Sequence, residues 1–266
     1  MTDLVAALGH PWLASVLLLA TRLGALFLMT PLLYSAPLPP LVRVLLVLGL
    51  AGAMALPFAD KPLPLADLGG LLKALLRELA VGATLGLGVL MAFGGFALAG
   101  RLIDVQVGFG MAQVFDPLTR SQVPALSSVV TLVGVLLFFL LDGPHALLRG
   151  IAYSLERFPL GQPWSLERAA PAVLKQAAGL FTLGFALAAP VVLCLLLLEF
   201  VLGVVARSLP QVNMFVLGIP VKIVVGLLAL SFWAGGMGAA SQRLYAEIYR
   251  GWSALFDGAA AAQERR

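Results

Sequence analysis

Few side chains in this sequence are of the types that bind metals or carry out redox chemistry. The chain has two histidines, His10 and His145, and a single cysteine, Cys194, and these residues lie far apart in the sequence. A zinc or redox site needs several such ligands at short spacing, and an internal disulfide needs a second cysteine. We therefore expect no metal centre, no disulfide and no cofactor.

Three aspartates are the remaining candidates for acid–base chemistry. Asp104, Asp116 and Asp142 lie in different sequence contexts, without a nearby histidine or a nucleophile pattern. The sequence has no P-loop motif for phosphate binding, and the two glycines at 86 and 88 are not followed by the rest of a dinucleotide fingerprint. We expect that the chain is not an enzyme.

A second group of chemically capable residues consists of charged side chains inside or beside apolar segments. They are Arg22, Arg43, Glu78, Glu199, Arg207 and Lys222. Such residues either form a proton or ion relay, or pair and extend toward the membrane surface to fix the helices. The carboxylates are too few and too scattered for a relay, which favours the second role. We expect Arg22, Glu78 and Lys222 to lack partners in an isolated chain. Glu199 and Arg207 are candidates for contacts with another subunit.

The overall composition indicates what kind of protein must position these residues. Of the 266 residues, 61% are hydrophobic and only 11% are charged, whereas soluble domains have about 25% charged residues. The sequence therefore predicts an integral membrane protein. The net charge of +4 comes from scattered Lys and Arg without a basic run, which argues against nucleic-acid binding. No basic residue precedes the first apolar run, so we expect it to be retained rather than cleaved as a signal peptide.

Hydropathy predicts an all-α fold with about six apolar helical segments, several of them kinked or hairpin-like. The segments are residues 11–33, 38–58, 79–100, 123–141, 176–198 and 223–241. Prolines break the link between the first two segments, and glycines at 82, 86 and 95 in the third indicate tight helix packing. Lys and Arg are concentrated in the loops on the side of both termini, which predicts that the termini lie in the cytoplasm.

Residues 100–122 form an unusual connector between two uncharged apolar runs. Polar side chains from Arg101 to Arg120 are mixed there with Phe109, Met111 and Phe115, and with Gly108. This mixture does not fit in lipid, yet it is too apolar for an ordinary solvated loop. The connector is therefore expected to be buried in protein or to line a cavity.

A second polar segment, residues 207–215, joins the fifth and sixth apolar segments. Pro210 is expected to stop the preceding helix, while the amides of Gln211 and Asn213 can satisfy its last carbonyl groups. This pattern predicts two half-helices that meet at a buried turn. The longest polar link, residues 142–175, contains an amphipathic patch at 147–155 and is expected to form an interfacial hairpin.

Three of these stretches resemble the flagellar biosynthetic protein FliR family. They are residues 100–109 with Asp116-Pro117, the Asp-Gly-Pro-His turn at 142–145, and residues 207–213 continuing to 218–222. The resemblance covers nearly the whole chain, and the Pro-Gln-Val-Asn sequence at 210–213 is its most specific part. The family motif has His directly after Asp-Gly, whereas here Pro144 intervenes, so no role is assigned to His145.

The resemblance implies a core subunit of the type III protein export gate, at the flagellar basal body in the bacterial cytoplasmic (inner) membrane. Its implied partners are FliP-like and FliQ-like subunits in one helical complex, an FlhB-like gate component, unfolded export substrates and membrane lipid. It further implies a single membrane-embedded domain, residues 1–266. Within it, residues 1–122 would be a FliP-like half with the connector 100–122 as a plug loop, and 123–251 the remaining hairpins. From its residues, the segment 252–266 is expected to be a flexible tail or a partner contact.

A pore wide enough for an unfolded chain needs an apolar constriction that yields and closes again. From the residues alone, the apolar side chains of the connector are more simply explained as filling packing gaps, but the family's pore-plugging loop at this position favours a plug. The predicted plug is Gly108, Phe109, Gly110, Met111, Val114 and Phe115. The predicted anchors are Arg101, Asp104, Gln106 and Asp116. Predicted buried polar contacts to partners are Glu199, Arg207, Gln211, Asn213 and Lys222.

The main alternative is a small-molecule or ion transporter, because broken apolar segments beside polar stretches are also typical of that class. Transporters usually contain internal repeats with paired broken helices, and residues 100–122 and 207–222 bear little likeness to each other. A membrane-embedded enzyme would require converging catalytic side chains, which the sequence does not contain.

Overall fold

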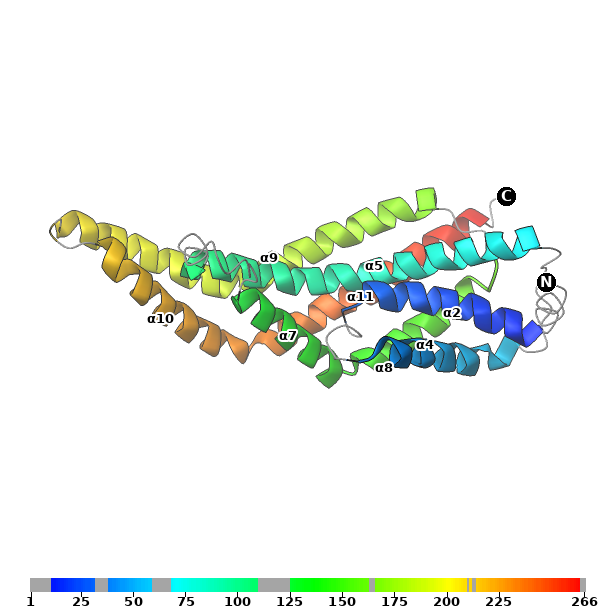
Figure 1. Ribbon diagram of the computed structural model, residues 1–266. Helices are drawn as coiled ribbons and strands as arrows, with labels where there is room; N and C mark the ends of the chain where they lie inside the picture. The colour runs from blue at the N-terminus through cyan, green and yellow to red at the C-terminus, as the bar shows by residue number, and fades with distance from the viewer. Residues whose placement is uncertain are drawn as a thin grey trace. The chain divides into compact units, whose positions relative to one another are not determined.

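A computed structural model describes residues 11–31, 38–58, 68–109, 125–162, 166–209, 211 and 214–263. Within these ranges the regular secondary structure is helical throughout (Figure 1). The helices are α2 (Pro11–Met29), α4 (Pro40–Ala55) continued by η1 (Leu56–Phe58), α5 (Leu68–Val107), α7 (Ala125–Leu140), α8 (Gly143–Arg157), α9 (Leu166–Ser208), α10 (Met214–Ala234) and α11 (Met237–Gln263). The prediction of an all-α fold is confirmed.

Five of these helices are long and apolar enough to cross a membrane, or up to six if the bent pair α7–α8 counts as one span. The predicted number of about six apolar segments agrees with this. The predicted bounds are too short for α5 and α9, which have 40 and 43 residues. Polar residues such as Lys73, Glu78 and Lys175 end the apolar windows but are good helix formers, so the helices continue past them.

The α7–α8 pair bends by 71° at a two-residue break. Asp142 occupies the left-handed region there with a φ of 55°, and Pro144 lies in the first turn of α8, where its missing N–H leaves no hydrogen bond unmade. The predicted amphipathic patch is confirmed as part of α8, which buries Leu147, Ile151 and Leu155. Residues 252–266, predicted to be a flexible tail, are helical as far as Gln263.

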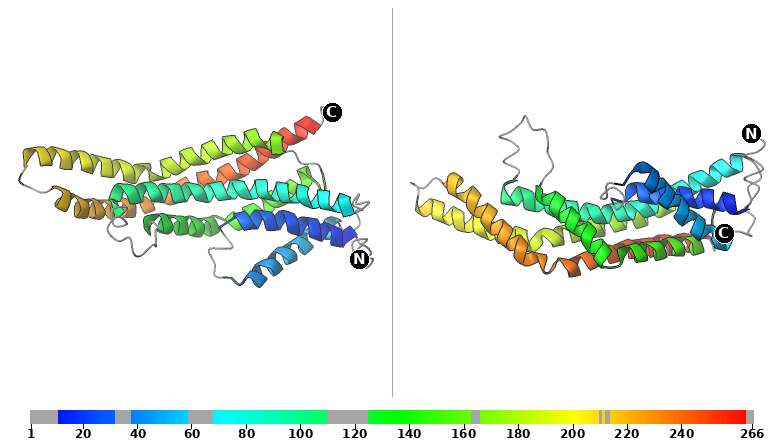
Figure 2. Two further views of the ribbon diagram at one scale, coloured as in Figure 1. Left: turned by 45° about the horizontal axis from the view of Figure 1, so that its top comes forward. Right: turned by 60° about the horizontal axis from the view of Figure 1, so that its bottom comes forward.

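The chain divides into two compact units. Unit 1 comprises Met1–Leu90, Asp142–Ala177 and Ile248–Arg266, and unit 2 comprises Met91–Leu141 and Ala178–Glu247. Within unit 1, the helices α2 and α4 lie side by side (Figure 2). The prediction of a single domain with a FliP-like first half stays a prediction.

Each unit has its own apolar core. In unit 1, Leu18, Leu26, Leu85 and Phe256 are fully buried. In unit 2, rings from three helices pack together: Phe93 and Phe96 of α5, Phe138 of α7 and Tyr245 of α11. Burying one large apolar side chain contributes about 1.5–3 kcal/mol to stability, so these clusters hold the helices of each unit together.

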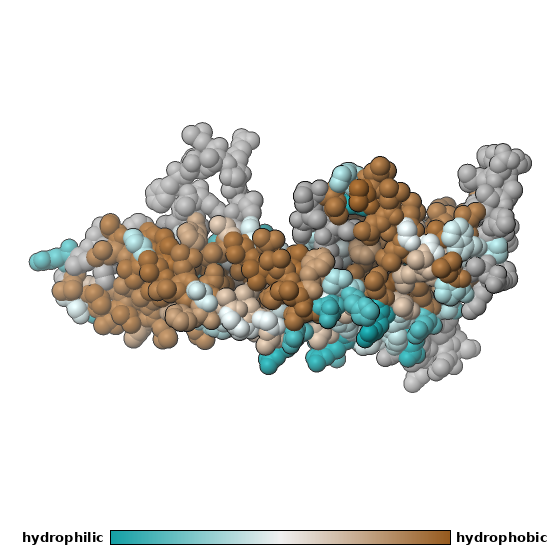
Figure 3. Space-filling view, turned by 90° about the horizontal axis from the view of Figure 1, so that it is seen from below, coloured by the Kyte–Doolittle hydropathy of each residue, from teal (hydrophilic) through white to brown (hydrophobic). Residues whose placement is uncertain are grey.

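Much of the remaining apolar surface has no partner within the described residues. Only Ala51 and Ala55 of α4 are buried, and α10 is equally uncovered, with Phe232 86% exposed. Figure 3 shows hydrophobic side chains over most of the face drawn, with many hydrophilic ones gathered in one region. This distribution is expected of a chain that is covered by lipid or by other membrane subunits.

Candidate functional site: buried polar clusters between the helices

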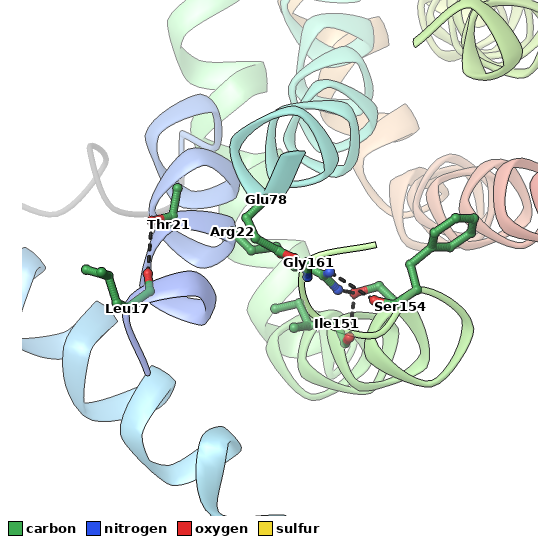
Figure 4. Close-up of polar contacts among 8 residues, drawn as sticks. Leu17, Thr21, Arg22, Glu78, Ile151, Ser154 and Gly161 are labelled. Atoms are coloured by element: carbon green, nitrogen blue, oxygen red, sulfur yellow. Dashed lines mark hydrogen bonds and ion pairs between the residues drawn. The ribbon is translucent and has the colours of Figure 1, made fainter. Parts of the chain in front are cut away.

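The most completely buried polar cluster in the described residues is centred on Arg22 of α2. Its Nε donates a hydrogen bond to Glu78 Oε2 of α5 at 2.6 Å, and both side chains are only 1% exposed. One terminal nitrogen donates to Ser154 Oγ at 3.2 Å and the other to the carbonyl oxygen of Phe158 at 2.9 Å (Figure 4). Every nitrogen of the guanidinium group therefore has an acceptor, which is the condition for a stable buried ion pair.

The second oxygen of Glu78 connects this pair to the turn after α8. Oε1 accepts the backbone N–H of Gly161 at 2.9 Å, and Arg77 donates to the carbonyl of the same glycine at 3.0 Å. Gly161 has a φ of 79°, which favours glycine at this position. The cluster thus ties α2, α5 and the 158–161 turn together. The expectation that Arg22 and Glu78 lack partners in the chain is wrong, because each meets the other.

Glycines allow α2 and α5 to approach closely beside this ion pair. A Cβ atom at Gly82 would overlap the backbone carbonyl of Arg22, and a Cβ at Gly86 would lie 2.9 Å from the carbonyl oxygen of Leu26. The predicted tight packing at these two glycines is confirmed. The close approach brings Arg22 within reach of Glu78, which lies one turn before Gly82.

In unit 2, the carboxylate of Asp104 caps the beginning of α7. Its Oδ1 accepts the backbone N–H of Leu126 at 3.0 Å and its Oδ2 accepts that of Ser127 at 2.8 Å, and Asp104 is only 4% exposed. Ser127 Oγ donates in turn to the carbonyl of Ala97, and a Cβ at Gly100 would overlap the Ser127 backbone. A carboxylate from one helix therefore satisfies N–H groups that the next helix leaves unpaired. We call Ala97, Gly100, Asp104, Leu126 and Ser127 the Asp104 clamp.

The structure changes the limits of the predicted plug loop. α5 continues to Val107, so residues 100–107, including Arg101, Asp104 and Gln106, are helical rather than part of a connector. The prediction ended the apolar segment at residue 100 because polar side chains follow. In the structure these side chains lie on the last two turns of a long helix. Gly108, with a φ of 97°, ends the helix and Phe109 follows it. Gly110, Met111, Val114, Phe115 and Asp116 lie outside the described residues.

A second ion pair joins α9 to α10. Lys222 Nζ donates to Glu199 Oε1, with the two side chains 25% and 38% exposed respectively. The expectation that Lys222 lacks a partner in the chain is therefore wrong. The pair borders a cavity of ≈ 460 Å³ that also includes Gly108, Gly203 and Gly218. Contacts from Glu199, Lys222 and Arg207 to another subunit stay a prediction.

The described residues of the predicted turn between α9 and α10 are not buried by this chain itself, and burial of the turn against a partner stays a prediction. Arg207, Ser208, Leu209 and Gln211 are all exposed, and α9 ends at Ser208. Two long helices that form a hairpin place their connection at the tip, where the last carbonyl groups reach solvent or a partner. Arg207 in the last turn is favourable there because it complements the negative end of the helix dipole. Pro210 and Asn213 lie outside the described residues.

The structure also shows polar contacts that had no signal in the sequence. Tyr245 donates its hydroxyl hydrogen to the carbonyl of Gly134, and burial raises the pKa of this phenol, which keeps it protonated as a donor. Trp252 Nε1 donates to the carbonyl of Leu85 at 3.2 Å. Because these partners are more than a hundred residues apart, neither periodicity nor a motif could have found them.

The described residues contain no group of three or more His, Cys, Asp or Glu side chains placed to hold a metal ion. His145 contacts Arg149 at 3.2 Å on the exposed side of α8, and Asp142 is an exposed residue at the bend. What the polar clusters can do is join helices and fix the ends of connections, which is a structural task rather than bond-making chemistry.

Comparison with known proteins identifies related sequences along most of the chain. A family model described as bacterial export proteins, family 1, matches residues 13–248. The chain is 33% identical to the flagellar biosynthetic protein FliR of Bacillus subtilis (strain 168) over 217 residues, which is 80% of this chain and 83% of that protein. It is 31% identical to the protein of the same name from Aquifex aeolicus (strain VF5), over 84% of this chain and 86% of that protein. It is also 27% identical to the Yop proteins translocation protein T of Yersinia pestis, over 85% of this chain and 88% of that protein.

Proposed function

The chain belongs to the bacterial export proteins, family 1, and from this we propose that it is a core subunit of the flagellar-type (type III) protein export gate. As a member of an export family, it is a component of an export apparatus and not an enzyme. Family membership also displaces the small-molecule or ion transporter that the sequence left as the alternative. The relatives named FliR support a flagellar rather than an injectisome assignment.

In this proposal the chain lies in the bacterial inner membrane at the flagellar basal body. It assembles there with FliP-like and FliQ-like subunits and an FlhB-like component, and unfolded flagellar subunits pass through the complex. The observation that carries the assembly is the extent of uncovered apolar surface on α4 and α10. The partly exposed Glu199–Lys222 pair supports it as well, because charges in an apolar hairpin need protein or water rather than lipid beside them.

We also propose that residues 108–115 close the pore at rest. The Asp104 clamp supports this, since it joins the helices on both sides of the segment through buried hydrogen bonds. Such a clamp provides fixed ends for a stretch that must yield to a passing peptide. Arg101, Gln106 and Asp116 would assist as anchors near those ends.

The test is the resting ion conductance of the purified complex in a planar bilayer. Phe109→Ala removes apolar seal area and Gly110→Val restricts the backbone, so each is expected to change the resting leak. Leu72→Ala is the matched control, because Leu72 is an exposed apolar residue near the start of α5, outside the proposed plug. Identical leak in the wild type and in both loop variants would contradict the plug. Mass spectrometry of the co-purified subunits, from the same preparation, tests membership of the gate separately.

A further inference from the structure

A cavity of ≈ 620 Å³ within unit 1 has the size of a ligand site. Small-molecule sites in proteins usually enclose about 300–1,000 Å³. The walls of the cavity come from α2, from the end of α4 with η1, and from α8 with the turn that follows it. Most of the lining is apolar and includes Met54, Phe58, Leu155 and Leu160.

Two polar side chains line this cavity, and neither has a partner among the described residues. Glu156 of α8 is the only ionisable residue in the lining; it is exposed and forms no hydrogen bond or ion pair there. Ser15 of α2 is 0% exposed, and its Oγ has no hydrogen-bond partner. Buried hydroxyl groups in native proteins nearly always have one. The cavity therefore offers a bound molecule one negative charge and one hydrogen-bond donor.

The cavity lies where two candidate membrane spans end. Ser15 is the fifth residue of the span Pro11–Met29, and Phe58 is the last residue of the span Pro40–Phe58. The two ends are neighbours, because η1 contacts α2. At 1.5 Å per residue, Ser15 is about 6 Å along α2 from its first residue. The ends of spans lie near the lipid headgroups, so the cavity is at the depth where a headgroup joins its acyl chains.

The turn that forms one wall is fixed by the Arg22–Glu78 pair. At the beginning of the turn, the carbonyl of Phe158 accepts a hydrogen bond from Arg22, and at its end the N–H of Gly161 donates to Glu78. These bonds hold the wall in place whether or not a ligand is bound. A preformed site loses less conformational freedom on binding, which favours affinity.

We propose that this cavity binds phosphatidylethanolamine, with the ammonium group of the lipid at Glu156 and an acyl chain along the apolar walls. The ammonium group has three N–H donors and a positive charge, which complement a carboxylate without a partner. An ester oxygen of the lipid accepts the hydrogen bond that Ser15 leaves unmade. Phosphatidylcholine has no N–H donor and phosphatidylglycerol has no positive charge, so the site distinguishes these lipids. The inference needs only that α2 and α4 span the membrane, and it does not rest on the proposed export role.

The experiment uses the full complex, reconstituted in phosphatidylcholine vesicles that contain a phosphatidylethanolamine with a photoreactive group in one acyl chain. After illumination, labelled peptides are mapped by mass spectrometry. Labelling is expected on residues 54–58 and 152–160. Excess unlabelled phosphatidylethanolamine should suppress it, whereas excess phosphatidylglycerol should not. Labelling elsewhere only, equal suppression by both competitors, or equal labelling by a photoreactive phosphatidylcholine would overturn the proposal.

Two variants and a matched control test the cavity itself. Ala152→Leu fills part of the cavity and should abolish the labelling. Ala146→Leu is the same change on α8, at an equally half-buried alanine that does not line the cavity, so labelling should be retained. Ser15→Ala removes a hydroxyl that has no partner in the described chain, so it should weaken the labelling without lowering the stability of the lipid-free complex. Undiminished labelling of Ala152→Leu would contradict the site.

The exposed carboxylate gives a variant that should not disturb folding. Glu156→Gln should lower the preference for phosphatidylethanolamine over phosphatidylcholine about tenfold, because hydrogen bonds to charged groups are stronger than neutral ones by about that factor in affinity. An unchanged preference would show that Glu156 does not bind the headgroup. A photoreactive amino acid at position 152 that cross-links to a protein segment instead of to lipid would likewise refute a lipid site.

Discussion

Replacing Glu78 by glutamine should strongly destabilise unit 1. Arg22 is 1% exposed and its charge is balanced by Glu78 alone among the described residues. The glutamine oxygen can still accept the N–H of Gly161, but its NH2 group would then face the Nε–H of Arg22, so two donors oppose each other. Breaking one partner of a buried ion pair costs about 3–5 kcal/mol. Since whole proteins are stable by only about 5–15 kcal/mol, a large part of the stability would be lost.

The double replacement Arg22→Met with Glu78→Leu distinguishes the contribution of the ion pair to stability from the contribution of its other hydrogen bonds. Apolar residues of similar volume can replace a buried ion pair at little or no loss of stability. Here, however, the replacement leaves the Gly161 N–H without the Glu78 carboxylate, at about 1–3 kcal/mol. The double variant should therefore still be less stable than the wild type, and similar to or more stable than Glu78→Gln.

Unfolding of the chain in mixed micelles with increasing fractions of sodium dodecyl sulfate measures these differences, with circular dichroism as the signal. Arg149→Gln is the control, because Arg149 is exposed and its loss should change the free energy of unfolding by less than about 0.5 kcal/mol. If Glu78→Gln unfolds at the same detergent fraction as the wild type, the ion pair does not stabilise unit 1 and the reasoning is refuted.

Three further predictions concern unit 2. Asp104→Asn presents an NH2 group to one of the two N–H groups that begin α7, so hydrogen exchange there should accelerate; unchanged protection would exclude the clamp as a stabilising contact. Gly100→Val would overlap the Ser127 backbone and should lower stability by about 1–3 kcal/mol in the same micelle assay, whereas an equally stable variant would show that the helices can separate at no cost. Exchanging Glu199 and Lys222 keeps the pair within the chain but reverses its direction, so the chain should fold while fewer partner subunits co-purify; normal co-purification would limit the pair to a role inside the chain.

Hydropathy could predict the parts of the fold in which contact with lipid requires apolar side chains. The apolar middles of α5 and α9 were located correctly, and the family inferred from residues 100–109 and 207–222 is confirmed. The ends of α5 and α9 were predicted too close to their middles, because polar residues beyond the apolar segment can remain helical. Lipid compatibility limits the apolar window of a helix, whereas caps and neighbouring helices determine where the helix stops.

The partners of buried charges could not be predicted for a different reason. Arg22 meets a carboxylate 56 residues away and a hydroxyl 132 residues away. Such pairs depend on which helices become neighbours, and that is decided by packing at glycines such as Gly82 rather than by any local pattern. Asp104 was predicted as an anchor from its position in the polar first part of the connector, but its hydrogen bonds to α7 could only be seen in the structure.

The Arg22–Glu78 pair also has a consequence for how the chain enters the membrane during synthesis. A charged residue in the middle of an inserting helix costs about 2.5–3.5 kcal/mol at the translocon. Glu78 is made 56 residues after Arg22, which at about 5–20 residues per second is a delay of roughly 3–11 s. During that interval α2 has an unneutralised cation inside its apolar face. A later helix, α5, therefore supplies the carboxylate that neutralises the charge buried in the first described span.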